Sequence, residues 1–449
     1  MKHPPAPTRI GNLDSSLVAT VDARGLVTPA AGGWTLDWWI GADDRWHLPS
    51  QEPGTAVTQR LVDGAPVVET SMRVPGGHAV HRAWCVRDGG RELAVVEVEN
   101  ASRVPFAVAL ALRPNRAVTS AAIEGRVVVV NRRAAVVLPR VPSRVATSSG
   151  DDGDLADVVL SGAAGEGGDV AVRSRRRNAQ LAVLHPLAHT AQVRVALPLG
   201  RVSRPDAAAV DLAALPDAER VARGWALHLD AALRVDLPDE RLVDAVRACR
   251  ASLLLGDVPR AEARLVAAAL ERWGHLPPGR RRLPATVALD GALAQLDAVL
   301  AAASRVWTWP APDDRLAPAT VLHLVRELLV AEDVERRHIA LAAAAVADGW
   351  LGRGFEVHGA PTRWGRVSYA VRWHGARPAL LWDVETADGT APVRLTAPGL
   401  DPTWSSSEPA GEALLAPVEP PGGLPKVVAP LAGDGTPADA ASDPGVSFS

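Results

Sequence analysis

The residues best suited to ligand contact lie in residues 361–382, where the pattern predicts a β-hairpin. The stretch contains Trp364, Arg372, His374 and Trp382. The chain has 14 Trp but only 3 Phe and 1 Tyr, whereas a chain that uses Trp mainly as core would normally use Phe as well. Flat aromatic rings can stack on sugar rings, and Arg and His can donate hydrogen bonds to hydroxyls. The stretch therefore predicts a sugar-binding surface. The alternative is a solvated strand face with structural arginines.

A second tryptophan cluster lies near the N-terminus and contains Trp34, Trp38, Trp39 and Trp46. Burying one Trp side chain removes about 150–250 Å² from water, which is worth about 4–6 kcal/mol as an upper bound. Leaving several of these rings exposed would forfeit much of that energy. We therefore expect most of them to be core, and the alternative is that one or two stack on a sugar.

Carboxylates would be needed for glycoside hydrolysis, which uses an acid with a raised pKa facing a base or nucleophile. Residues 217–350 contain many Asp and Glu, but most fall at the starts of predicted helices or on their polar faces. Solvation explains such positions without a reaction. The catalytic residues are thus unknown from the sequence.

Metal and cofactor motifs are weak. His185 and His189 have four-residue spacing, but Pro186 argues against a helix and no third ligand is evident. Residues 151–154 lack the twelve-residue calcium-loop pattern and its closing Glu. The sequence contains no nucleophile elbow, phosphate-binding loop or dinucleotide fingerprint. We therefore predict neither a metal nor a cofactor.

The composition limits the classes of partner and compartment. The formal net charge of -3 argues against nucleic-acid binding. The two cysteines, Cys85 and Cys249, form no disulfide framework. The first residues show no apolar signal region, and the apolar run 339–347 is too short to cross a bilayer. These features predict a cytoplasmic protein without membrane contact.

Short strands dominate residues 10–205, which read as one β-sandwich domain after a flexible N-terminus, residues 1–9. Runs such as 65–74 and 192–197 alternate apolar with polar residues between Gly, Pro and Asp clusters. Many such strands indicate a large antiparallel sandwich. Residues 147–178 interrupt the pattern and predict a long hairpin or loop.

Helical periodicity replaces this pattern in residues 206–350, which predict an α-helical domain. Six helices are expected, at 217–233, 239–255, 260–273, 285–304, 316–331 and 335–347. Residues 351–416 return to strand alternation and predict a small C-terminal β-domain, whereas residues 417–449 predict a disordered tail. The fold class is therefore α+β and multidomain.

Several segments resemble the six-hairpin glycosidases of the glucoamylase, trehalase and glycoside-phosphorylase type. Residues 10–25, 69–77 and 95–106 resemble strands of their N-terminal supersandwich, and residues 235–242 resemble the entry to their first barrel helix. Residues 350–416 resemble the C-terminal β-domain of uncharacterised actinobacterial relatives.

The resemblance implies a substrate-contacting turn near Asp290, which Gly291 follows. It also implies a barrel of twelve helices, which at about 12 residues per helix and about 5 per loop would need roughly 200 residues. Residues 217–350 are too few for that, so we expect a partial α/α barrel. A half-barrel would leave an apolar edge, which a second copy or tight docking onto the sandwich would have to cover.

These features predict a carbohydrate-related protein, a non-catalytic or degenerate glycosidase-like relative that binds or regulates glycans. The first alternative is an active glycoside hydrolase or phosphorylase on α-glucan-type oligosaccharides, with a carboxylate pair in a cleft between sandwich and helices. The second alternative is a structural or protein-interaction module, which predicts buried tryptophans and no open pocket. The expected partner is an oligosaccharide or polysaccharide, and the chain could form a homodimer.

Overall fold

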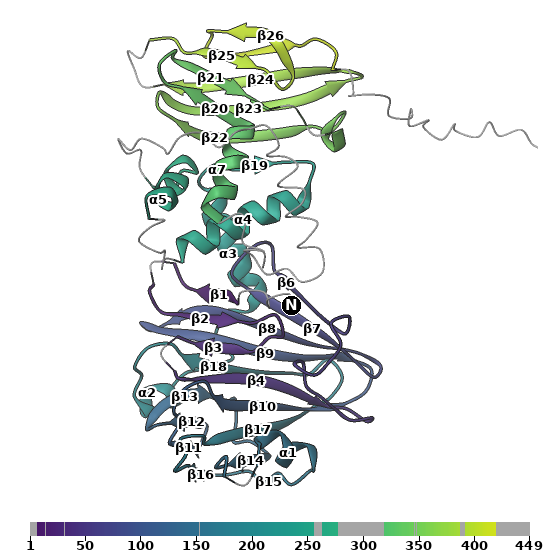
Figure 1. Ribbon diagram of the computed structural model, residues 1–449, viewed down its shortest axis with the longest axis vertical. Helices are drawn as coiled ribbons and strands as arrows, with labels where there is room; N and C mark the ends of the chain where they lie inside the picture. The colour runs from purple at the N-terminus through teal and green to yellow at the C-terminus, as the bar shows by residue number, and fades with distance from the viewer. Residues whose placement is uncertain are drawn as a thin grey trace, which may run out of the picture.

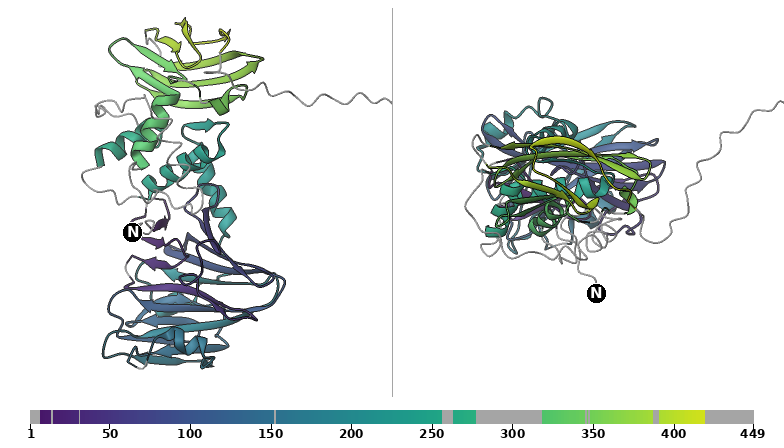
Figure 2. Two further views of the ribbon diagram at one scale, coloured as in Figure 1. Left: turned by 45° about the vertical axis from the view of Figure 1, so that its right-hand side comes forward. Right: turned by 90° about the horizontal axis from the view of Figure 1, so that it is seen from above.

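The computed structural model describes residues 7–418, apart from 14, 31, 152, 256–262, 277–317, 345, 347 and 387–390. The elements form three groups along the long axis of the molecule (Figure 1). Two large sheets occupy one end, helices lie in the middle, and two smaller sheets occupy the other end. The turned view shows the same order (Figure 2).

The first large sheet is antiparallel, and β5 pairs with its strand β4 outside the main order. Its strands, in spatial order, are β1 (Thr8–Gly11), β2 (Val18–Val21), β3 (Val27–Pro29), β4 (Trp34–Gly41), β10 (Phe106–Pro114), β17 (Gln180–Leu187), β14 (Arg144–Ser148) and β15 (Gly165–Glu166), with β5 at Trp46–His47. One short helix, α1 (Leu155–Leu160), packs on the outer face of this sheet.

The second large sheet is also antiparallel. Its strands, in spatial order, are β16 (Val170–Arg173), β11 (Ser120–Glu124), β12 (Val127–Val130), β13 (Arg133–Val137), β18 (Gln192–Pro198), β9 (Arg91–Ser102), β8 (Gly77–Asp88), β7 (Val68–Val74) and β6 (Val57–Leu61). The two sheets share one hydrophobic core, in which Trp38 and Leu110 of the first meet Met72 and Val96 of the second. The alternation of apolar and polar residues within each strand produces this two-layer packing.

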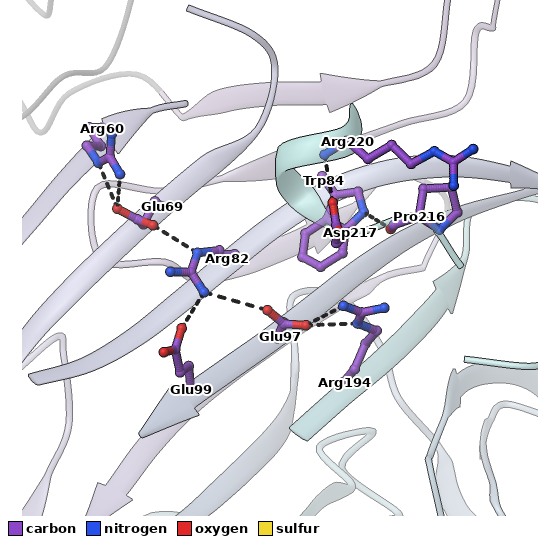
Figure 3. A network of polar contacts seen from close by, with 10 residues as sticks. All are labelled: Arg60, Glu69, Arg82, Trp84, Glu97, Glu99, Arg194, Pro216, Asp217 and Arg220. Atoms are coloured by element: carbon purple, nitrogen blue, oxygen red, sulfur yellow. Dashed lines mark hydrogen bonds and ion pairs between the residues drawn. The ribbon is translucent and has the colours of Figure 1, made fainter. Parts of the chain in front are cut away.

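A network of ion pairs covers part of the outer face of the second sheet (Figure 3). Glu97 is nearly buried and lies 3.6 Å from Arg82 and 2.7 Å from Arg194. Arg82 also pairs with Glu69 and Glu99. Opposite charges on neighbouring strands form cross-strand pairs, and these pairs stabilise this face of the sheet.

The helices begin directly beside this network. Trp84 donates through Nε1 to the Pro216 carbonyl at 3.1 Å, and Asp217 caps the next helix by accepting from the Arg220 amide (Figure 3). The described helices after the sandwich are α2 (Arg204–Ala208), α3 (Ala218–Asp230), α4 (Glu240–Leu254), α5 (Ala263–Arg272) and α7 (Pro318–Leu329). Trp225 of α3 packs with Trp84 in one cluster, so α3 docks on the second sheet.

Two smaller sheets complete the fold. The third sheet contains β19 (Arg234–Asp236), β22 (Phe355–Thr362), β23 (Gly365–His374), β24 (Arg377–Thr386) and β27 (Ala410–Leu414). The fourth contains β20 (Val330–Asp333), β21 (His338–Leu341), β25 (Arg394–Ala397) and β26 (Asp401–Ser406), and a 3-10 turn, η1, spans Asp348–Trp350. Their inner faces share a core with α4, α5 and α7.

The architecture is mixed α and β with several antiparallel sheets, as the sequence predicts at that level. The helix predicted at 335–347 is wrong, because this stretch contains β21, and β20 lies just before it at 330–333. The loop predicted at 147–178 contains α1, β15 and β16. Strand β1 begins at Thr8, inside the stretch expected to be a flexible N-terminus.

The partial α/α barrel stays a prediction, because the helix expected at 285–304 lies outside the described residues. The tail expected at 417–449 lies almost entirely outside them as well, since they end at residue 418. Among the helices that the structure describes, none is both long and apolar enough to cross a bilayer.

Candidate functional site

A polar hollow of about 460 Å³ lies on the outer face of the first sheet, away from the shared core. We call it the outer-sheet pocket. All of its lining residues except Leu26 and Pro114 are polar or charged: Asp22, Arg24, Thr35, Asp37, Ser50, Arg113, Asn115, Asp154, Asn178 and Gln180. Every one of them belongs to the sandwich, and none belongs to the helices.

Strand β4 places Asp37 in the pocket. Its even positions, such as Leu36 and Trp38, face the shared core, so the odd positions Thr35 and Asp37 face outward. Asp37 is only 6% exposed, and its Oδ1 accepts from the Trp38 amide at 2.9 Å. Burial raises the pKa of the Asp37 carboxyl; hydrogen bonds and Arg113 act in the opposite direction.

The turn between β2 and β3 supplies a second carboxylate, Asp22. Its Oδ1 accepts from the amides of Arg24 at 2.8 Å and Leu26 at 2.9 Å, which fixes the turn. Burial raises the pKa of Asp22 and these backbone hydrogen bonds oppose the rise. The charge of Asp22 also contributes to the raised pKa of Asp37, so the two carboxyls lie close enough to interact.

Arg24 lies in the same turn. Its carbonyl accepts from Trp38 Nε1 at 3.0 Å. Its Nη1 is buried and has no hydrogen-bond acceptor within the part of the chain that the structure describes. A buried donor without an acceptor is costly, so a shift of the Arg24 side chain toward a ligand oxygen in the pocket would restore a hydrogen bond.

The opposite wall comes from β10, β17 and the start of α1. Arg113 donates through Nη2 to Asp154 Oδ2 at 2.8 Å, and Asp154 Oδ1 caps α1 by accepting from the Ala156 amide at 3.0 Å. Gln180 accepts from the Leu155 amide at 3.3 Å. The side chains of this wall are therefore held in place by protein contacts, which preorganises the site.

The loop that carries Ser50 to the pocket is tied by His47. This imidazole lies 2.9 Å from Asp44 through Nε2 and 3.1 Å from Glu52 through Nδ1. Arg45 binds Glu52 through two nitrogens. The three contacts close the loop on itself, which holds Ser50 near the sheet.

The chemistry of the pocket is that of multiple hydrogen bonds to a polyhydroxylated molecule. Carboxylates accept from hydroxyls, guanidinium groups donate to ring and hydroxyl oxygens, and the amides of Asn115 and Asn178 can do both. No tryptophan lines it. Within the described residues no group of three or more His, Cys, Asp or Glu could hold a metal ion.

The N-terminal tryptophans lie beside this pocket but not in it. Trp34, Trp38 and Trp39 are 4%, 1% and 0% exposed and fill two hydrophobic clusters. Their burial leaves no ring face for a sugar, so their place is the core. Trp46 is partly buried and packs against the cluster that contains Trp39.

The C-terminal hairpin exists as β23 and β24, but its tryptophans also point inward. Trp364 and Trp382 are 9% and 8% exposed. Arg372 and His374 lie on the exposed face, where Arg372 pairs with Glu356. The structure does not bring these four residues together with the outer-sheet pocket. Asp290 lies outside the described residues.

The pocket residues were not predicted, since they are spread from residue 22 to residue 180. One signal was available in Asp37, a carboxylate inside the strand Trp34–Gly41, in which every residue but the last is buried. A charged group at such a position must be paired or functional.

The chain shows a distant likeness to known proteins in structure and none in sequence. No protein family model matches the chain, and no curated protein does. Among solved structures, it is similar to a bacterial glucoamylase complexed with acarbose, at 11% identity and a TM-score of 0.36. The match covers 56% of this chain and 42% of that one, so the chain spans less than half of the glucoamylase. A likeness of this size carries no argument about function.

Proposed function

We propose that this chain is a carbohydrate-related protein that binds a glycan at the outer-sheet pocket without cleaving it. The observation that carries the proposal is the preorganised set of Asp22, Arg24, Asp37 and Arg113 around one hollow. Sugar hydroxyls are read by charged and amide side chains that both donate and accept. The volume of about 460 Å³ falls within the range of small-molecule sites.

Binding without cleavage is supported by how the carboxylates are engaged. Asp154 uses one oxygen for Arg113 and the other to cap α1. Asp22 is held by backbone amides of its own turn. A general base or nucleophile needs an oxygen turned to the substrate, so Asp154, with both oxygens engaged, serves better as a fixed hydrogen-bond partner. Asp22 uses Oδ1 alone for its turn.

An active glycoside hydrolase is the second candidate, because one observation favours it. Asp37 is a buried carboxyl with a raised pKa in the same hollow as Asp22, and a general acid needs a raised pKa. The cleft would then lie on the sandwich itself and not between sandwich and helices. The alternative of a structural or protein-interaction module predicts buried tryptophans and no open pocket. The buried tryptophans support it, but the presence of the pocket does not.

Calorimetric titration with neutral and acidic oligosaccharides tests the proposal. We expect saturable binding by the wild type, and about tenfold weaker binding by Asp37→Asn, because a hydrogen bond to a charged group is lost. Asp383→Asn, at an exposed position of β24, is the matched control and should bind as the wild type does. Chromatography of the same mixtures separates binding from cleavage. Absence of binding to every glycan would refute the proposal.

A further inference from the structure

Arginines gather at one end of the molecule, where three segments lie side by side: Arg116, Arg132, Arg133, Arg173 and Arg175–Arg177. Backbone hydrogen bonds join these segments, from Val118 N to the Arg177 carbonyl at 2.9 Å, from Ser174 N to the Thr119 carbonyl at 3.0 Å and from Asn131 N to the Ser120 carbonyl at 3.0 Å. All of these arginines are exposed. We call this set the arginine rim. It lies around β11, β12 and β16, at the end opposite the two smaller sheets (Figure 1).

The positive charge of the rim is barely neutralised. The three segments, 114–119, 131–134 and 171–178, contain no Asp or Glu. Within the described residues the rim has one ion pair, between Arg176 and Asp151 at 3.1 Å. The chain as a whole is slightly acidic, so this concentration of charge is local. Like charges held together repel, and an anionic ligand would relieve that repulsion.

Two rim arginines occupy backbone positions that arginine normally avoids. Asn131 and Arg132 have φ of 47° and 67° and form the two-residue turn between β12 and β13. The second position of such a turn is most often glycine. Arg177 likewise has φ of 60°. These turns direct charged side chains outward at positions where a small residue would be less strained.

The rim adjoins the outer-sheet pocket. Asn115 and Asn178 both line the pocket, and they are the chain neighbours of Arg116 and Arg177. A bridge between Val118 and Asn178 ties the two stretches together. A chain-like ligand with one unit in the pocket would therefore have its next units beside the rim.

We propose that the pocket and the rim together bind an acidic polysaccharide, a chain of sugars that carry carboxylates. This inference rests on the proposed glycan binding and adds the charge class of the ligand. One sugar would present its hydroxyls to Asp37 and Arg24, while carboxylates on neighbouring sugars would meet Arg175 and Arg176. Guanidinium groups bind carboxylates through paired hydrogen bonds. Sugar units carry several hydroxyls that can donate to the carboxylates of the pocket, whereas the internal nucleotides of DNA carry none.

The test compares oligogalacturonates with maltooligosaccharides of equal length by calorimetry. The variant Arg173→Ser/Arg175→Ser/Arg176→Ser removes rim charge, and Arg103→Ser/Arg201→Ser/Arg366→Ser removes the same charge from exposed positions elsewhere. The rim variant should bind the acidic chain about tenfold or more weakly and the neutral chain unchanged, whereas the control variant should match the wild type. High salt should reduce the preference of the wild type for the acidic chain.

Three results would overturn the inference, and they are distinguishable. The wild type could bind the oligogalacturonate and the maltooligosaccharide with equal affinity, which the rim variant does not change and Asp37→Asn weakens. This result would support the proposed glycan binding but refute the preference for an acidic polysaccharide. If neither oligosaccharide binds, both the proposed glycan binding and the preference for an acidic polysaccharide are refuted. Tight binding of a single-stranded DNA oligomer that Asp37→Asn leaves unchanged would assign the rim to nucleic acid.

Discussion

Gln59 donates through Nε2 to the backbone carbonyl of Asp22 at 2.7 Å, and so links the second sheet to the turn that forms one wall of the outer-sheet pocket. The same Nε2 also donates to Thr70 Oγ1 at 2.9 Å. Gln59 is 4% exposed and Thr70 is fully buried. A side chain in the shared core thereby determines where Asp22 and Arg24 lie.

Substituting Gln59→Leu should weaken both the fold and the pocket. It leaves the Asp22 carbonyl and the Thr70 hydroxyl without this donor, which costs about 1–3 kcal/mol of unfolding free energy. Because the turn is then released, glycan affinity should fall as well. Thr70→Val is the control: it removes the other bond of Gln59, so it should lower stability but leave affinity unchanged. Denaturant unfolding and calorimetry on both variants check this. Equal effects of the two variants on affinity would contradict a positioning role for Gln59.

The buried charge of the Asp37 carboxylate should lower the stability of the fold at neutral pH. Burial raises the folded-state pKa of the Asp37 carboxyl above its ordinary value, so the folded chain holds this proton more tightly than the unfolded chain does. The stability contribution of Asp37 therefore falls as the pH rises from about 3.8 through the folded pKa, and stays low above it.

The variant Asp37→Asn keeps the oxygen that accepts from the Trp38 amide and removes the buried charge. We expect a higher melting temperature than the wild type at pH 7 and a smaller difference at pH 4, together with weaker glycan binding. Asp154→Asn is a useful contrast, since it weakens an ion pair and should lower the melting temperature at pH 7. A lower melting temperature for Asp37→Asn at pH 7 would argue against a destabilising charge.

His81 should make the fold sensitive to acid. It is 1% exposed, stacks on Trp38 with ring centroids 5.1 Å apart, and burial lowers its pKa to about 3. Between about 6.5 and about 3 the unfolded chain binds a proton at this residue that the folded chain does not. Stability therefore rises with pH across this window, by up to about 1.4 kcal/mol per pH unit for one proton.

The variant His81→Phe keeps a ring against Trp38 and removes this titration, so the unfolding free energy should depend less steeply on pH between 3 and 6.5. Some slope should persist, because burial also lowers the pKa of His185 to about 4 and that of His275 to about 3. His78→Phe, at an exposed position of the same strand, should leave the slope as in the wild type. An unchanged slope for His81→Phe would show that His81 titrates normally.

The sequence predicts the sheets better than the site. Strand alternation locates β6 and β7, because a strand buried on one face repeats every two residues. The apolar run at 339–347 leads to the helix predicted at 335–347, since a short apolar run does not distinguish a buried strand from a helix. Its β21 part pairs in parallel with β25, a partner more than 50 residues away that no local pattern reveals.

The pocket is harder still to predict, because strand pairing assembles it. Asp37 and Arg113 meet only because β4 pairs with β10 in a register that sets Ala111 opposite Asp37. Gln180 joins them because β10 pairs with β17. Abundant tryptophan is instead a local signal, and it led to residues that the core needs for packing.

The network around Glu97 provides the last prediction, because two of its carboxylates differ mainly in exposure. Glu97 is 6% exposed at its side chain and lies between Arg82 and Arg194, whereas Glu99 is 30% exposed and, within the described part of the chain, pairs with Arg82 (Figure 3). Glu97→Gln should cost about 1.5–3 kcal/mol, since hydrogen bonds to a buried charge are lost. Glu99→Gln should cost less than about 1 kcal/mol, since solvent screens that pair. Urea unfolding of both variants measures the difference.

Raising the salt concentration should shrink the effect of Glu99→Gln more than that of Glu97→Gln, because exposed pairs are screened more strongly. Equal costs for the two variants would mean that burial does not govern the strength of this network.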